Sequence, residues 1–414
     1  MMSFSEIVSI LPRMKSGEEL RAELENLPDY NPDVLNADAS VRLMALSDLH
    51  RVYIPSQMSL EIYSKLYLAL LRSIQKKGTK LAVRQKNQNY RAIMRREYNG
   101  LIGGADSFTI IGSSGIGKSS AVSRAISLIT EDRVIEMEEP HAYIAPCVTV
   151  QCPFDSSVKG LLLEILRKID EVLDTKYYDK ALRGRATSDM LIGSVSQAAL
   201  NHVGLLVVDE IQNVANNKNG RRLIGALTQL INNSGISICM VGTPESVEFF
   251  ESAMQLARRS VGLQYTAMEY DNFFKTFCST LFQYQYVRQR IEISDGVIKW
   301  LYERSAGITS IVVSLIHDAQ EIAILNGKEK LDMESLNEAY QKRLSLLHKY
   351  IQPEQTKKQN KKTKKKNVAP TKTPKFIPSG DNVSVAKLVE KSKKENIDIV
   401  SLLKKYFPVM EVKI

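Results

Sequence analysis

Cysteine and long apolar runs are scarce in this 414-residue sequence, and each shortage excludes a class of protein. The four cysteines are too few and too widely spaced for a disulfide framework, and none has a Cys or His partner at metal-ligand spacing. We expect them to be buried or incidental thiols. No stretch approaches the roughly 20 apolar residues that span a bilayer. The first residues also lack the basic start and apolar core of a secretory signal. These features predict a cytoplasmic protein with no membrane partner.

Acidic residues are the minority, 46 against 56 Lys and Arg, but the net charge of +10 is unevenly placed. Residues 353–378 hold nine lysines and one glutamate, a net charge of +8, and residues 379–414 add +2. The first 352 residues are therefore neutral overall. Any contact of that part with DNA must come from a local patch rather than from a global field.

The periodicity of the chain predicts an α/β fold followed by a small helical domain. Apolar residues at three- and four-residue spacing predict a helix over 55–77. Short β-like runs at 107–111, 145–151, 204–209 and 236–242 alternate with helical segments, a pattern typical of a parallel sheet covered by helices on both faces. Residues 295–305, 310–326 and 332–348 then read as amphipathic helices.

These patterns divide the chain into five parts. We expect an N-terminal extension at 1–50, a nucleotide-binding core at 51–265 and a helical lid at 266–350. A lysine-rich linker at 351–382 is too polar to pack a core and should be disordered. The last part, 383–414, regains helical periodicity over 383–407. We interpret it as an amphipathic docking segment, with a loosely packed tail as the alternative.

A phosphate-binding loop follows the first predicted strand. The pattern G-x-x-x-x-G-K-[ST] lies between the apolar run that ends at Ile111 and a helical segment at 121–129. Its glycines let backbone N–H groups face inward as an anion nest, and the helix N-terminus adds partial positive charge. Lys118 can reach the β and γ phosphates, and Ser119 can ligate Mg²⁺. The predicted nucleotide-binding residues are Gly112, Ser113, Ser114, Gly115, Ile116, Gly117, Lys118, Ser119 and Ser120.

Two adjacent carboxylates complete the predicted site. Asp209 and Glu210 end the apolar strand 204–209, and alternation along a strand directs their side chains apart. Asp209 would hold Mg²⁺, and Glu210 would polarise the attacking water. The pairing of this motif with the loop predicts a Mg²⁺-dependent ATPase, with ATP and Mg²⁺ as its cofactors.

Three further residues are candidates for catalysis. Thr243 follows the strand 236–242 and is a candidate γ-phosphate sensor, or else an ordinary turn residue. Arg258 and Arg259 follow a helical stretch, and one of them would reach into the site of a neighbouring subunit. Otherwise the two arginines are surface charge or DNA contacts.

The sequence also resembles a family, the AAA+ transposition regulators of the TnsC and TniB type, and more distantly MuB. The resemblance covers roughly residues 25–345. It depends on runs at 51–55, 148–153, 155–161, 169–170, 174–178, 209–213, 281–285 and 305–309, which occur in the family's order. It implies an AAA+ P-loop NTPase fold, an α/β core with an all-α lid. It also places Tyr53 and Ile54, at the start of the core, among the cofactor-binding residues.

The family resemblance implies a function as well. Such proteins bind duplex DNA as an ATP-dependent homo-oligomer, a ring or a helical filament, and link a target-selection protein of the TniQ or TnsD type to a transposase. The transposon could be CRISPR-associated. The family's DNA contacts correspond here to Lys159, Thr175 and Lys176, although lysines at such positions are equally common on solvated helix faces. One departure is that no arginine follows Gly307 in the lid, which predicts slow turnover.

Two alternatives remain open at this point. A replication initiator or helicase-loader ATPase would share the fold, but it would usually carry a winged-helix domain where this chain has the lysine-rich linker. A nucleotide-switched scaffold would bind ATP and hardly hydrolyse it. Glu210 argues against the scaffold, while the missing lid arginine favours it.

Overall fold

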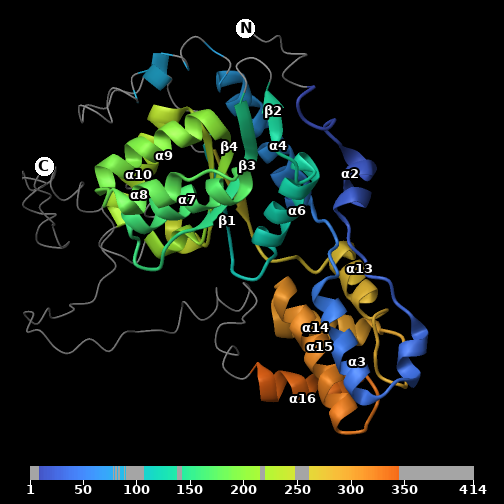
Figure 1. The fold of residues 1–414 in the computed structure, drawn as a ribbon. Helices are drawn as coiled ribbons and strands as arrows, with labels where there is room; N and C mark the ends of the chain where they lie inside the picture. The colour runs from blue at the N-terminus through green and yellow to red at the C-terminus, as the bar shows by residue number, and fades with distance from the viewer. Residues whose placement is uncertain are drawn as a thin grey trace, which may run out of the picture. The chain divides into compact units, whose positions relative to one another are not determined.

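The computed structural model describes residues 9–77, 79, 82, 84–87, 89, 107–137, 142–214, 220–247 and 261–344. All of them lie within Met1–Lys358, the first of two compact units of the chain. A layered α/β core and a helical lid make up this unit (Figure 1). The predicted helix at 383–407 and the lysine-rich linker lie outside the described residues.

The core is built on one six-stranded sheet in the order β2-β3-β4-β5-β1-β6. Its five longer strands are parallel, and only β2 at the edge runs antiparallel, against β3. The strands are β1 (Phe108–Gly112), β2 (Ile135–Met137), β3 (Ala142–Gln151), β4 (Val203–Asp209), β5 (Ser237–Gly242) and β6 (Val261–Tyr265). The predicted parallel sheet is therefore confirmed, and β2 and β6 are additions to it.

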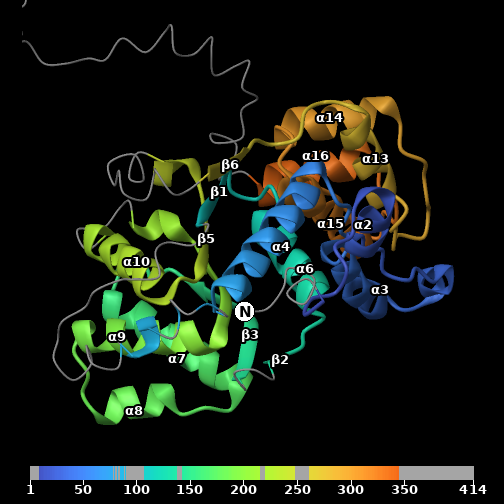
Figure 2. The ribbon, with the colours of Figure 1, turned by 90° about the horizontal axis from the view of Figure 1, so that it is seen from above.

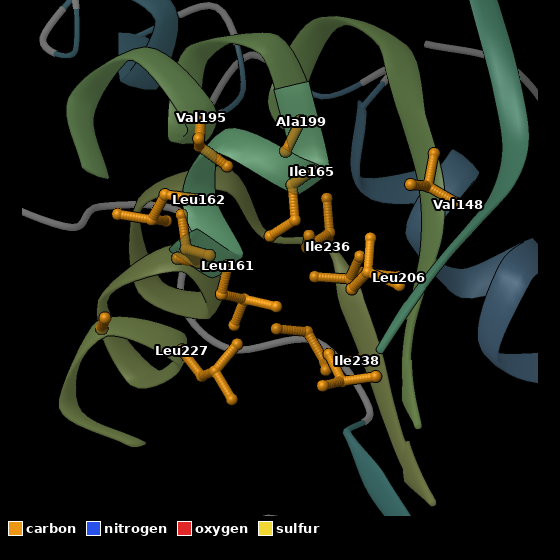
Figure 3. Packing of buried hydrophobic residues seen from close by; sticks show 14 of the residues in the cluster. Val148, Leu161, Leu162, Ile165, Val195, Ala199, Leu206, Leu227, Ile236 and Ile238 are labelled. Carbon is orange, nitrogen blue, oxygen red and sulfur yellow. The ribbon is translucent and has the colours of Figure 1, made fainter. Parts of the chain in front are cut away.

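Successive side chains along the strands pack alternately into two separate hydrophobic cores, one on each face of the sheet. In β4, Leu206 and Val208 face one side of the sheet, whereas Leu205 and Val207 face the other. The first side is covered by α7 (Val158–Leu173), α9 (Ser188–His202) and α10 (Gly220–Ser234), as the packing in Figure 3 shows. The short α8 (Tyr177–Arg183) packs on α7 and α9. The second side is covered by α4 (Gln57–Lys77) and α6 (Lys118–Thr130), which lie beside each other in Figure 2.

The lid is a cluster of four described helices, three of which begin at a side-chain cap. It contains α13 (Asn272–Leu281), α14 (Asp295–Ser305), α15 (Thr309–Leu325) and α16 (Met333–Arg343). Asp271, Ser294 and Asp332 each accept a hydrogen bond from the first turn of the helix that follows. No single described helix is long and apolar enough to cross a bilayer. Only α14 and α15 together reach that length and apolarity, as a pair bent by 120°, and both bury apolar side chains in the lid core.

The N-terminal residues pack in two places rather than forming a unit of their own. Helix α2 (Gly17–Leu24) packs against α4 and α6 and shares their core cluster. The following segment contributes Leu46, Leu49 and Val52 to the lid core. That segment contains η1 (Pro32–Asn36), α3 (Ala39–Ala45) and η2 (Leu46–His50), and α3 lies beside α15 in Figures 1 and 2.

Candidate nucleotide-binding site

The strand order brings the predicted motifs to one edge of the sheet. Strand β5 lies between β1 and β4, so the residues that follow these three parallel strands meet at their carboxyl ends. From β1 the chain crosses to one half of the sheet, and after β5 it crosses to the other, to β6. Ligands of open parallel sheets bind in the crevice at such a switch point.

The loop after β1 has the backbone that an anion nest requires. Gly115 and Gly117 take φ values of 80° and 92°, and α6 begins directly afterwards at Lys118. The Lys118 ammonium donates to the carbonyl oxygens of Gly112 and Ser113, each at 2.8 Å. Burial lowers the pKa of Lys118, although the carboxylates of Asp209, Glu210 and Glu245 oppose this shift. The lysine is thus held at the loop beside three acidic groups.

Ser119 and Asp209 are in direct contact, which joins the two motifs in one site. The Ser119 hydroxyl donates to Asp209 Oδ2 at 2.7 Å, and the backbone N–H of Glu210 donates to Oδ1 at 2.8 Å. A hydroxyl and a carboxylate are oxygen ligands of the kind that Mg²⁺ prefers, so these two side chains fit the predicted metal site. Glu210 is exposed and has a positive φ of 56°, a strained backbone for a non-glycine residue.

Thr243 follows β5, the strand that lies between β1 and β4. It begins the turn into η4 (Pro244–Ser246), and its carbonyl accepts from the Ser246 hydroxyl at 2.6 Å. A hydrogen bond from the Thr243 side chain holds the pKa of Glu245 below its usual range. The threonine hydroxyl is therefore engaged, beside the carboxylate that also faces Lys118.

A cleft of about 410 Å³ opens over the phosphate-binding loop. Besides the loop and the ends of β4 and β5, its walls come from the N-terminal segment and from the lid. Tyr53 and Ile54, which the resemblance gives as cofactor-binding candidates, line it. Tyr53 is anchored by its hydroxyl to Ser59 at 2.8 Å, and the Arg124 guanidinium lies over its ring at 4.6 Å. The apolar wall consists of Leu49, Val52, Ile54, Met58, Ile116, Met268, Phe277 and Val313.

The lid reaches the loop through uncharged groups. Thr309 Oγ1 and the backbone N–H of Ser310 both donate to the Gly115 carbonyl, at 2.7 and 3.0 Å. A Cβ at Gly115 would lie 2.2 Å from Ser310 Oγ, so the loop needs glycine here. Among the described residues that line the cleft, Lys118 is the only Lys or Arg. The lid contacts of Thr309 and Ser310 and the position of Gln212, which also lines the cleft, were not predicted from the sequence, although Thr309 and Gln212 fall within the runs that carry the resemblance.

The predicted DNA contacts lie at the two ends of one helix. Lys159 is exposed in the first turn of α7, and Lys176 is exposed just beyond its last turn. The 16 residues of α7 separate them by about 24 Å at 1.5 Å per residue. The Thr175 hydroxyl donates to Asp170, whose carboxylate also accepts from Tyr177 N at 2.9 Å. The structure does not gather these three residues into one patch. Arg258 and Arg259 lie outside the described residues.

Part of this core matches a known protein family. Residues 103–267 match the family model described as "TniB: Bacterial TniB protein". No protein of curated function matches the chain.

Solved structures resemble the chain weakly. The Aeropyrum pernix ORC1 protein, solved in complex with DNA, is 16% identical with a TM-score of 0.41, and the match covers 62% of this chain and 63% of that one. This chain thus spans less than two thirds of that protein. Drosophila ORC bound to DNA is 12% identical with a TM-score of 0.43, covering 96% and 83%. The Thermotoga maritima RuvB Holliday junction branch migration motor is 13% identical with a TM-score of 0.35, covering 68% of each chain.

Proposed function

We propose that this chain, whose residues 103–267 match the TniB family model, is an AAA+ ATPase that hydrolyses ATP and uses the cycle to regulate transposition on duplex DNA. The observation that carries the proposal is the contact between Ser119 and Asp209, 90 residues apart in sequence, next to Glu210. It joins a phosphate loop, a metal-ligand pair and an exposed carboxylate in one cleft.

Each wall of the cleft has a part in binding ATP. The loop N–H groups, the start of α6 and Lys118 bind the phosphates, while the apolar wall beside Tyr53 and Ile54 accepts the base. Ser119 and Asp209 would hold Mg²⁺, which neutralises charge on the phosphate oxygens when bound. Glu210 takes a proton from the attacking water, and Thr243 contacts the γ-phosphate from the end of β5.

Turnover and assembly are connected in this proposal. One of Arg258 and Arg259 completes the site of the neighbouring subunit in a ring or helical homo-oligomer. The oligomer grips the DNA backbone through Lys159, with Thr175 and Lys176 as the further predicted contacts. It links a target-selection protein of the TniQ or TnsD type to a transposase. The uncharged lid contact of Thr309 and Ser310 favours slow hydrolysis, which also keeps a nucleotide-switched scaffold as the second candidate function.

The test separates nucleotide binding from hydrolysis. Lys118→Ala should abolish both nucleotide binding and ATP-dependent DNA binding. Glu210→Gln should retain both and lower kcat by about 10²- to 10⁴-fold, the usual contribution of a general base. Lys180→Ala, an exposed lysine on α8, is the matched control and should change neither. Equal nucleotide affinity in Lys118→Ala and wild type would contradict the assignment of the site.

A further inference from the structure

Gln212 lies between the carboxyl ends of the neighbouring strands β4 and β5. It belongs to η3 (Ile211–Val214), which follows β4 directly, and it lines the nucleotide cleft. Its Nε2 donates to Glu210 Oε2, so the amide holds the carboxylate that the proposed reaction uses. Among the described residues, no other side chain donates to the Glu210 carboxylate.

The other end of the same amide has no partner. Gln212 Oε1 is buried and accepts no hydrogen bond from the described residues. Buried acceptors in native proteins are nearly always paired, so an unpaired one calls for an explanation. The amide oxygen lies against Gly242, where an added Cβ would be only 3.1 Å away. The bare backbone at the end of β5 therefore leaves room for the side chains of Ile211 and Gln212.

We propose that Gln212 is a positioning residue for hydrolysis, and this inference rests on the proposed ATPase function. Its Nε2–H fixes Glu210, whose backbone already has a strained positive φ, in the cleft. A small turn of the amide away from Gly242 presents Oε1 to the cleft, where it accepts one O–H of the attacking water. Glu210 accepts the other. The two side chains together aim the water's lone pair at the γ-phosphorus.

The reaction balances with these two residues and water. A new bond forms between the water oxygen and the γ-phosphorus as the bond from phosphorus to the bridging oxygen of ADP breaks. That oxygen leaves with the electron pair, and one water proton moves to Glu210. Gln212 gains and loses no proton, so its contribution is orientation alone.

The experiment compares Gln212→Met with wild type in steady-state ATP hydrolysis. Methionine has a similar length and no amide, so the cleft stays filled while both hydrogen-bonding groups are lost. We expect kcat to fall by about 10²-fold, the effect of losing the orientation of a reacting group. KM and the affinity for a non-hydrolysable ATP analogue should stay unchanged. Gln229→Met, on the exposed face of α10, is the matched control and should leave kcat unaltered.

A second background shows whether Gln212 acts through Glu210. Residues that work as one unit give non-additive losses. Adding Gln212→Met to Glu210→Gln should therefore slow hydrolysis no further, while a merely structural role would lower kcat or nucleotide affinity again. Gln212→Glu, which preserves size but places a second carboxylate beside Glu210, provides the same test if the methionine variant folds poorly.

The outcomes distinguish a failure of the Gln212 role from a failure of the proposed ATPase function. Wild-type kcat in both Gln212 variants overturns the positioning role and leaves the ATPase intact. An additive loss in the double variant also overturns it. A wild-type protein that binds nucleotide without hydrolysing it contradicts the proposed ATPase function itself.

Discussion

Arg42 is a charged side chain in the interior, only 1% exposed, and its ion-pair partner Glu329 lies 287 residues away in sequence. It forms a two-pronged ion pair with Glu329, with both N–O distances at 2.6 Å. It also donates to the carbonyl of Tyr286 at 3.0 Å. The pair fastens the N-terminal helix α3 to the loop between α15 and α16.

Removing one partner of this pair should destabilise the lid. Arg42→Met leaves the half-buried carboxylate of Glu329 without its counter-charge, and such losses cost about 3 kcal/mol or more. The sole tryptophan, Trp300, lies in α14, so its fluorescence during urea unfolding reports on the lid. Arg13→Met is the control, because its pair with Glu19 is on the surface and should contribute less than about 1 kcal/mol. Equal urea midpoints for Arg42→Met and wild type would contradict this role.

The same pair predicts a pH dependence. The Arg42 hydrogen bonds hold the pKa of Glu329 below the ordinary value of 4.5. A carboxyl whose pKa is depressed by folding stabilises the native state fully above the unfolded pKa and loses that contribution as pH falls through the folded one. The stability gap between wild type and Arg42→Met should therefore be widest at neutral pH and shrink below about pH 4.5. A gap that is constant from pH 7 to pH 3 would show that the pair is not its source.

Single residues differ in how far the sequence could reveal them. Lys118, Ser119 and Asp209 were predictable because each motif includes the local strand or helix that positions it. The contact of Gln212 with Glu210 was not, because it depends on how η3 turns after β4. The partner of Arg42 was also unpredictable, because 287 residues separate the two ends of that ion pair.

At the scale of elements, the loop between β3 and α7 is tied to the segment after β4. Asn213 Nδ2 donates to the Cys152 carbonyl at 2.9 Å, and its own carbonyl accepts from the Ser156 hydroxyl at 3.0 Å. The backbone N–H of Asn213 donates in turn to Glu210 O at 3.0 Å. This fixed loop displays Phe154, which is 89% exposed. The loop therefore connects Asn213, which bonds to the Glu210 backbone, with the first turn of α7, where Lys159 lies.

Cutting this link should uncouple the two ligands. In Asn213→Ala, we expect nucleotide affinity to persist while ATP no longer raises DNA affinity, a loss of coupling of the order of 5- to 150-fold. Fluorescence anisotropy of labelled duplex DNA, with and without a non-hydrolysable ATP analogue, measures it. Asn337→Ala removes a comparable bond to a carbonyl on the exposed face of α16 and should change nothing. If ATP still raised the DNA affinity of Asn213→Ala as much as that of wild type, the hydrogen bonds of Asn213 would not couple the two sites.

The long periodic elements were the predictable ones. Helix α4 (Gln57–Lys77) and α14 (Asp295–Ser305) agree with the predicted 55–77 and 295–305, because their apolar faces repeat over several turns. Strand β6 escaped prediction, since its five residues, Val-Gly-Leu-Gln-Tyr, are too short and too mixed to show a period. It becomes a strand through pairing with β1, a contact that only the folded sheet supplies.

At the scale of the whole molecule, we propose two separate roles for the residues beyond Gln352. The lysines at 353–378 would add nonspecific grip on DNA, and 383–407 would dock a partner. Each lysine–phosphate contact contributes about −0.9 to the slope of log affinity on log salt. Truncation after Gln352 should remove several such contacts and make that slope correspondingly less steep. The DNA affinity of the truncated chain should still depend on ATP. Deleting only 383–414 should preserve the slope and abolish transposition, and full activity in that variant would defeat the docking role.

The ion pair of Arg42 also has a consequence for folding of the chain during its synthesis. Ribosomes add about 5 to 20 residues per second, so Glu329 is made roughly 15 to 60 s after Arg42, which lies 287 residues earlier. The α/β core, complete within the first 265 residues, can close during that interval. Leu46 and Leu49 must wait with their apolar side chains in water, because the lid helices that bury them do not yet exist. Newly made chains therefore pass through a period in which the nucleotide cleft lacks its lid wall and the N-terminal segment is open to chaperones.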